Sequence, residues 1–248
     1  MPPAPDASTV RAILLDIEGT TTPIDFVLKT LFPYASEHVE EFLGEVSSEA
    51  EVKTLIAELR STWSGAASSG APVWIESTPN EQLASAAAYV RWLIDRDSKM
   101  TPLKTLEGKI WERGFRTGAL KGEVYPDVAR AFARWRGQGR RIAIFSSGSV
   151  LAQKLLFAHS TAGDLSSYLE AYFDTSTGGK REPDSYKKIA AALGLAAGRV
   201  LFVSDLPAEL AAAGGAHMQT AHSLRPGVPE PASPEHWVIR TFDEILAD

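Results

Sequence analysis

RAILLDIEGTTTPIDF, residues 11–26, places an apolar run directly before two carboxylates and three threonines. The run VRAILLD at 10–16 is continuously apolar instead of alternating, which is typical of a strand buried on both faces of a parallel sheet. Asp16 and Glu18 follow where this strand meets a loop. Two carboxylates this close together repel each other without a cation, so their position is a feature to be explained.

Three further runs resemble the first, and helical patterns lie between them. RRIAIFSS (140–147), RVLFVSD (199–205) and HWVIRT (236–241) predict buried strands. PDVARAFARWRGQG precedes the second strand and PDSYKKIAAALGLAAG the third, each opening with Pro and closing at Gly. This alternation predicts an α/β fold, a doubly wound and mainly parallel sheet.

The alternation stops between the first and second strands. Residues 26–124 hold long amphipathic patterns, namely LKTLFPYASEHVEEFL, NEQLASAAAYVRWLIDRD and PLKTLEGKIWERGF, and no convincing strand. We therefore expect a helical cap domain at 26–124, inserted into a catalytic core formed by 1–25 and 125–248. The alternative is that these helices pack directly on the sheet as part of one domain.

Composition limits the function classes. The 248 residues are 44% hydrophobic, enough for a sizeable core, and the net charge of -6 comes without a concentrated basic block, so a nucleic-acid partner is not expected. With no cysteine, metal ligands are restricted to oxygen and imidazole, which suits Mg²⁺. No signal peptide or membrane-spanning run is evident, so we expect a cytoplasmic protein with no membrane partner. No sequence feature requires an oligomer, so we expect a monomer.

Polar residues follow three of the predicted strands. They are Asp16 and Glu18, then Ser146 and Ser147, then Asp205, and Lys180 lies in TGGKREP just before a helix. Ligands of open α/β sheets bind outside the carboxyl ends of the strands, so these groups are expected to converge.

Such a set suits the cleavage of a phosphate ester. The Asp16 carboxylate can attack phosphorus, and Glu18 can protonate the leaving oxygen and then activate water. Lys180 and Ser146 can stabilise the charge of the transition state. Mg²⁺ held by Asp16 and Asp205 would reduce the repulsion between the carboxylates.

Each feature also has an ordinary structural interpretation. A D-x-E pair after a strand is commonly a solvated loop, and Glu209 after Asp205 can be a first-turn acid of a helix. His217 and His222 are interpreted as structural residues near a fifth strand. Trp111, Phe115 and Tyr125 are expected to be core aromatics, or one of them lines an apolar substrate pocket. It is the combination and order of the polar features that favour a catalytic site.

The motifs DIEGT, SSGS, GGKREP and SDLPAE resemble, in this order, those of the haloacid dehalogenase superfamily. LLDIEGTTTPIDFVLKTLFPYA, LKTLEGKIWERGF, GALKGEVYPDV and IFSSGSVLAQKLLFAHS are similar to the enolase-phosphatases of methionine salvage, also called acireductone synthases. The usual second Asp of the first motif is Glu18 here.

The resemblance implies a fold, a reaction and roles. It implies a Rossmann-like core with a cap, and the Mg²⁺-dependent conversion of 2,3-diketo-5-methylthiopentyl-1-phosphate into the acireductone 1,2-dihydroxy-3-keto-5-methylthiopentene and phosphate. By resemblance, Asp16, Glu18 and Asp205 contact Mg²⁺, with Glu18 using its backbone carbonyl. Ser146, Ser147 and Lys180 then contact the substrate, and Asp16, Glu18 and Lys180 are catalytic.

Three other functions compete with this one. A phosphatase or phosphomutase for another small phosphoester would share the core, and a catalytically silent metal- or phosphate-binding module would share the fold. A dehalogenase is disfavoured because its chemistry has no leaving alkoxide for Glu18 to protonate. The base that enolises the substrate stays open, with Glu18 as the hypothesis.

Overall fold

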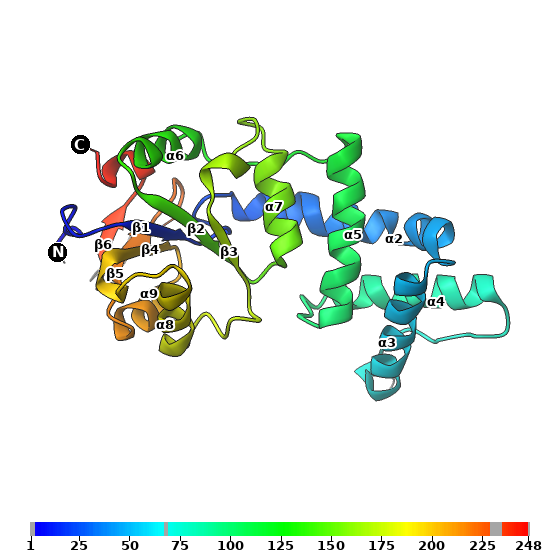
Figure 1. Ribbon diagram of the computed structural model, residues 1–248. Coiled ribbons are helices and arrows are strands. Elements are labelled where there is room, and N and C mark those ends of the chain that lie inside the picture. The colour runs from blue at the N-terminus through cyan, green and yellow to red at the C-terminus, as the bar shows by residue number, and fades with distance from the viewer. Residues whose placement is uncertain (1–2, 67–68, 229–234, 248) are drawn as a thin grey trace. The chain divides into compact units, whose positions relative to one another are not determined.

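The computed structural model describes residues 3–66, 69–228 and 235–247 (Figure 1). The chain divides into two compact units. Unit 1 comprises Met1–Phe26 and Lys121–Asp248, and unit 2 comprises Val27–Leu120. The chain thus leaves unit 1 shortly after the first strand and returns to it before the second.

Unit 1 is built on a six-stranded sheet of order β3-β2-β1-β4-β5-β6 in which every described pairing is parallel. The strands are β1 Ala12–Leu15, β2 Arg141–Phe145, β3 Ala171–Phe173, β4 Val200–Ser204, β5 Gln219–Ser223 and β6 Trp237–Ile239. All four residues of β1 are buried, because β1 lies in the middle of the sheet and helices cover both faces. This confirms the predicted α/β fold.

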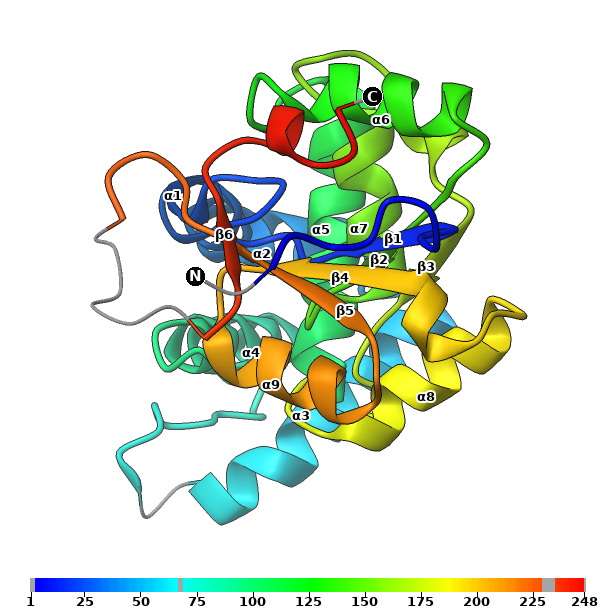
Figure 2. The same ribbon diagram turned by 90° about the vertical axis from the view of Figure 1, so that its left-hand side faces the viewer.

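Helices cover the sheet of unit 1 on its two faces. In Figures 1 and 2, α6 Val128–Gly137 and α7 Val150–Ala158 lie on one face, and α8 Pro183–Ala192 and α9 Pro207–Gly215 on the other. The apolar cluster under α8 and α9 includes Leu14, Phe145 and Phe202 from three neighbouring strands. The remaining helices of this unit are short: α1 Ile24–Phe26, η3 Ser166–Tyr168, η4 Ala197–Arg199 and η5 Phe242–Glu244.

Strands β1, β2, β4 and β6 were predicted from their apolar runs, whereas β3 was not. Its three residues, AYF, are only partly buried and lie at the edge of the sheet, so they form no continuous apolar run. The expected fifth strand is β5, and His217, with φ of 67°, lies in the turn between α9 and that strand.

Unit 2 is helical in its described residues. Its elements are the π-helix η1 Val27–Leu31 and the helices α2 Phe32–Val46, α3 Ala50–Ala66, α4 Pro79–Ile94 and α5 Thr101–Thr117. Thr78 caps α4 by accepting a hydrogen bond from the Glu81 amide, and Gly118 ends α5 in the left-handed conformation. Nowhere in the described ranges is a helix long and apolar enough to cross a membrane.

Candidate active site

The register of the sheet brings the predicted polar groups together at the carboxyl ends of the strands. Leu15 pairs with Ile144 of β2 and with Val203 of β4, so the three strands end at nearly the same level. Asp16 therefore lies level with Phe145 and Ser204, the last residues of β2 and β4. The convergence expected from the sequence rests on this register.

Asp16 is at the centre of a buried polar network. It is 2% exposed, and its Oδ1 accepts hydrogen bonds from Lys180 Nζ at 2.6 Å and from the Ile17 amide at 2.7 Å. Its Oδ2 accepts a hydrogen bond from Ser204 Oγ at 3.1 Å. Lys180 Nζ also lies 2.8 Å from Glu209 Oε2. Both oxygens of Asp16 are thus held by donors from three parts of the chain.

The loop after β1 folds back on itself. The amides of Thr20, Thr21 and Thr22 all donate to the carbonyl of Ile17, at 2.9 to 3.1 Å. Gly19 has φ of 67°, and a Cβ there would lie 2.4 Å from Asp205 Oδ2. Glycine is therefore required twice, for its backbone conformation and because the Asp205 carboxylate packs against the loop.

Glu18 and Ser146 face each other across the end of the sheet. Ser146 Oγ donates to Glu18 Oε2 at 3.3 Å and accepts from the Gly148 amide at 3.1 Å. Ser147, the next residue, lies in the same turn and is partly exposed. Ser149 begins α7 as its N-cap. The SSGS motif therefore places one hydroxyl at Glu18 and another at a helix start.

Lys180 reaches the site through a glycine turn before α8. A Cβ on Gly178 would lie 2.2 Å from Ser185 Oγ, so only glycine fits against the start of that helix. Tyr186 OH donates to the Lys180 carbonyl at 2.6 Å, which fixes the backbone of the lysine. The side chain is 8% exposed.

Four carboxyl groups of this set share the one ammonium of Lys180. Burial, followed by repulsion from Asp16, raises the pKa of Asp205 to about 6. The same two causes raise the pKa of Glu18, and they raise that of Glu209 to about 7. Although burial opposes it, the pairing with Asp16 and Glu209 raises the pKa of Lys180, which stays charged. The site therefore carries unneutralised negative charge.

That excess charge and the oxygen donors suit a small divalent cation such as Mg²⁺. Among the described residues no group of three or more His, Asp or Glu side chains is arranged to hold a metal ion by side chains alone. Two carboxylates, from Asp16 and Asp205, together with a backbone carbonyl could do so, which is the ligand set that the resemblance implies.

The other residues singled out in the sequence have structural environments. His222 is buried, and its Nε2 lies 3.0 Å from the Asp205 carbonyl. Trp111 and Phe115 are buried on α5. Tyr125 belongs to unit 1, where its ring lies 4.2 Å from the Arg225 guanidinium carbon. Tyr125 therefore does not lie in unit 2 with the other two aromatics.

Sequence reasoning gave no role in the network to Ser204 and interpreted Glu209 only as a first-turn acid of a helix. Ser204 Oγ lies 3.1 Å from both Asp16 Oδ2 and Glu209 Oε2, yet it is the last residue of β4 and was named only within the strand run and the SDLPAE motif. Glu209 lies in the first turn of α9, in the same motif as Asp205, and this position is the signal that could have indicated it.

Comparisons with known proteins identify the family of this chain. The family model of haloacid dehalogenase-like hydrolases matches residues 10–217. Enolase-phosphatase E1 of Synechococcus elongatus is 51% identical over 96% of this chain and 98% of its own length. Enolase-phosphatase E1 of Drosophila melanogaster is 47% identical over 88% and 84%. These matches extend through the helical unit as well as the sheet.

Solved structures of other proteins share the fold of this chain. The UTR4 protein of Saccharomyces cerevisiae, 35% identical, superimposes with a TM-score of 0.78 and covers 95% of this chain and all of that one. CbbY of Rhodobacter sphaeroides, in complex with phosphate, has a TM-score of 0.55 at 17% identity, covering 95% and 96%, and shows the fold alone.

The fold and the motifs at the strand ends define a haloacid dehalogenase-like hydrolase. Within that class, the chain belongs to the enolase-phosphatase E1 family.

Proposed function

We propose that the protein is a bifunctional enolase-phosphatase, an acireductone synthase of methionine salvage. It converts 2,3-diketo-5-methylthiopentyl-1-phosphate, a small-molecule phosphoester, into 1,2-dihydroxy-3-keto-5-methylthiopentene and phosphate. The observation that carries the proposal is the convergence of Asp16, Glu18, Ser146, Lys180 and Asp205 at one sheet edge. The 51% identity to a named enolase-phosphatase supports the substrate.

Asp16 is proposed as the nucleophile. A carboxylate oxygen of Asp16 forms a bond to phosphorus while the bond between phosphorus and the ester oxygen breaks, giving an aspartyl-phosphate. The hydrogen bonds from Lys180 and Ser204 hold the carboxylate in place. Water then attacks phosphorus, phosphate leaves, and Asp16 is restored.

Glu18 is proposed as the acid and base of these two steps. Its raised pKa favours the protonated form, so it can donate a proton to the leaving oxygen, and the carboxylate that results can accept a proton from water. The hydrogen bond from Ser146 Oγ fixes its orientation. Ser147 is proposed to donate to the phosphate oxygens, and Ser146 to do so when its single hydroxyl proton turns from Glu18 to the bound substrate. Lys180 is proposed to stabilise the charge of these oxygens.

Mg²⁺ is proposed as the cofactor, with Asp16, Asp205 and the carbonyl of Glu18 as its protein ligands. When bound, it supplies positive charge that neutralises the carboxylates and polarises the phosphate group. The packing of Asp205 against the backbone of Gly19 supports this ligand set, because it places that carboxylate beside the loop which carries Asp16 and Glu18.

Glu18 is also our hypothesis for the base of the enolase half, because it is the longer of the two acids in DIE. If Glu18→Gln retains full enolisation and loses only phosphate release, Glu18 is not that base.

The experiment is incubation with the diketone phosphate and Mg²⁺ while enol absorbance and phosphate release are followed separately. We expect the enol to appear first and phosphate to follow, and both to stop when the metal is chelated. Phosphate release without any enol intermediate would contradict the bifunctional proposal. A parallel panel of sugar phosphates distinguishes a phosphatase for another small phosphoester, and no turnover of any of them would indicate a silent binding module.

Unit 2 is proposed to act as the cap domain, corresponding to the predicted segment 26–124, and unit 1 as the catalytic core, predicted as 1–25 and 125–248. The cytoplasmic location and the monomeric state stay predictions.

A further inference from the structure

Arg225 is a buried cation outside the four motifs. It follows β5 by two residues, on the sheet edge where the site lies, and its side chain is 3% exposed. A buried guanidinium is costly unless its donors are satisfied and its charge is paired. The hydrogen bonds and ion pair of the guanidinium therefore indicate the role of Arg225.

The guanidinium binds the loop after β1 through two hydrogen bonds that converge on one carbonyl oxygen. Nε donates to the carbonyl oxygen of Thr20 at 2.8 Å, and Nη2 donates to the same oxygen at 2.6 Å. Charged donors make hydrogen bonds roughly twice as strong as neutral ones, and the planar fork fixes the direction of the carbonyl.

The opposite side of the guanidinium is anchored in the core of unit 1. Nη1 lies 2.6 Å from Asp127 Oδ2, and this carboxylate oxygen also accepts from the Phe242 amide at 2.5 Å. The rings of Tyr125 and Phe242 lie 4.2 and 4.4 Å from the guanidinium carbon. Aromatic rings at these distances favour a cation between them.

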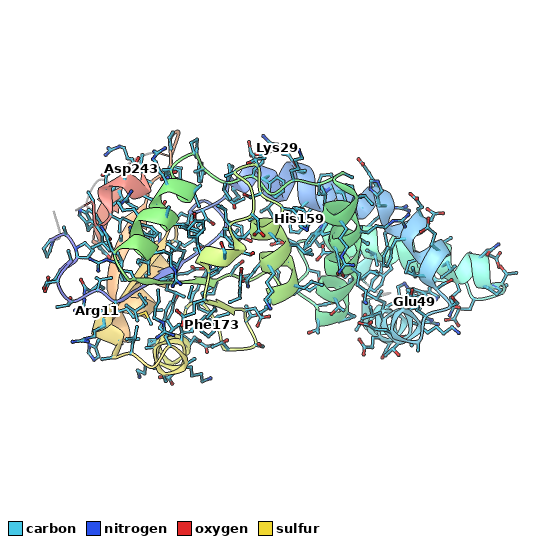
Figure 3. All side chains as sticks on the ribbon, turned by 45° about the horizontal axis from the view of Figure 1, so that its top comes forward. Arg11, Lys29, Glu49, His159, Phe173 and Asp243 are labelled. Carbon is cyan, nitrogen blue, oxygen red and sulfur yellow. The ribbon has the colours of Figure 1, made fainter. Side chains whose placement is uncertain are left out.

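The anchor is itself part of a firmly attached segment. Asp243, next to Phe242, forms an ion pair with Arg130 of α6, and Figure 3 shows Asp243 on the C-terminal helix beside α6. The amide of Tyr125 donates to the carbonyl of Thr21 at 3.0 Å. Arg225 thus joins the segment by which the chain leaves unit 1 to the segment by which it returns.

The carbonyl of Thr20 belongs to the loop that carries Asp16 and Glu18. The Thr20 amide donates to Ile17, between these two acids, so a shift of Thr20 moves the turn in which both lie. Glu18 must stay within reach of Ser146 Oγ, and the hydrogen bond between them is already 3.3 Å long. The loop therefore tolerates little displacement before this contact is lost.

We propose that Arg225 is a positioning residue that clamps the Thr20 carbonyl and so holds Asp16 and Glu18 in their catalytic places. The proposal rests on the proposed phosphatase function but does not depend on which phosphoester is cleaved. It assigns a role to a residue that touches neither Asp16 nor Glu18 through any described contact.

The test compares Arg225→Lys with Arg140→Lys. Lysine keeps the charge but has no planar fork to hold the Thr20 carbonyl. Arg140 is the matched control because its Nη1 and Nη2 both donate to the carbonyl of Ala7 at 3.2 Å, at the amino end of β2 and away from the site. We expect Arg225→Lys to lower kcat for p-nitrophenyl phosphate by about 10- to 100-fold with KM changed less than about threefold. Arg140→Lys should keep kcat within about threefold although it loses the same kind of fork.

Hydrogen exchange of the amides of Thr20, Thr21 and Thr22, measured without metal or substrate, is the second readout. These amides donate within the loop, so releasing the clamp should increase their exchange rates at least about tenfold in Arg225→Lys and not in Arg140→Lys. Tyr125→Leu removes one flanking ring at a partly exposed position and should give intermediate effects, which keeps the proposal testable if Arg225→Lys does not fold.

Two results would overturn the proposal: unchanged kcat and unchanged exchange in Arg225→Lys, or losses of equal size in Arg225→Lys and Arg140→Lys. If the wild-type protein releases no phosphate from any phosphoester, the proposed function fails instead, and the exchange experiment still decides whether the clamp exists.

Discussion

Glu107 on α5 is a buried acid in unit 2, and replacing it with Gln should make the stability of the protein less dependent on pH between about 5 and 8. Its side chain is 4% exposed, on a helix whose buried residues include Leu106, Ile110 and Trp111. Burial raises the pKa of Glu107 to about 8, and the nearby charges of Lys99 and Lys104 only partly oppose this. The folded protein therefore holds Glu107 protonated at neutral pH.

The size of the effect follows from the pKa difference. In the unfolded chain the pKa is near 4.5, so between pH 4.5 and about pH 8 the folded state binds more protons than the unfolded state. The free energy of unfolding must then fall as pH rises through this window. At about 1.4 kcal/mol for each pKa unit, the full loss is about 5 kcal/mol, of which about 4 kcal/mol falls between pH 5 and pH 9.

Glutamine has the same shape and no charge, so Glu107→Gln should remove this loss. The measurement is urea denaturation of both proteins from pH 5 to pH 9, where the difference between the two unfolding free energies cancels the other titrating groups. We expect the difference to grow by about 4 kcal/mol in favour of the variant. Glu58→Gln, at an exposed position on α3, is the matched control and should stay within about 0.5 kcal/mol of the wild type. A difference for Glu107→Gln that changes by less than about 1 kcal/mol over this range would refute the reasoning.

Three further substitutions test the site and its scaffold. Gly19→Ala should cost about 1–2 kcal/mol of stability because residue 19 has a left-handed backbone conformation. It should also lower phosphatase kcat by about 100-fold, because the new Cβ displaces the Asp205 carboxylate. A fully active variant would contradict that geometry. Lys180→Met leaves Asp16 and Glu209 buried without their cation. Urea denaturation should show that the unfolding free energy falls by about 3–5 kcal/mol at pH 8 and by less at pH 5, where Glu209 is protonated. Equal losses at both pH values would argue against the charge explanation. Gly122→Ala brings a Cβ to 2.3 Å from the Leu156 carbonyl oxygen and should cost about 1–3 kcal/mol of stability. Its control is Gly137→Ala, which has open space at the end of α6 and should be neutral or stabilising by up to about 1 kcal/mol. Equal effects in thermal unfolding would show that the close approach at Gly122 is unimportant.

Local patterns in the sequence predicted most of the sheet and the identity of the reactive groups. Strands β1, β2 and β4 are buried on both faces, which requires continuous apolar runs, and such runs are visible without a structure. Pro183 at the start of α8 is likewise a local signal. Strand β3 left no such signal because its run AYF is only three residues long and has no β-branched residue, whereas β6, equally short at the other edge, contains Val238 and Ile239.

The sequence by itself determined which chemical groups the site contains, because a carboxylate, a hydroxyl or an ammonium is a property of the residue alone. Only the tertiary structure decided which of them meet. Lys180 reaches Asp16 across 164 residues of sequence, and Arg225 reaches Thr20 across 205. These pairings depend on the parallel register of the strands and on the glycine turns that let loop and side chain approach. No local sequence pattern specifies these long-range contacts, because each depends on how many other parts of the chain pack together.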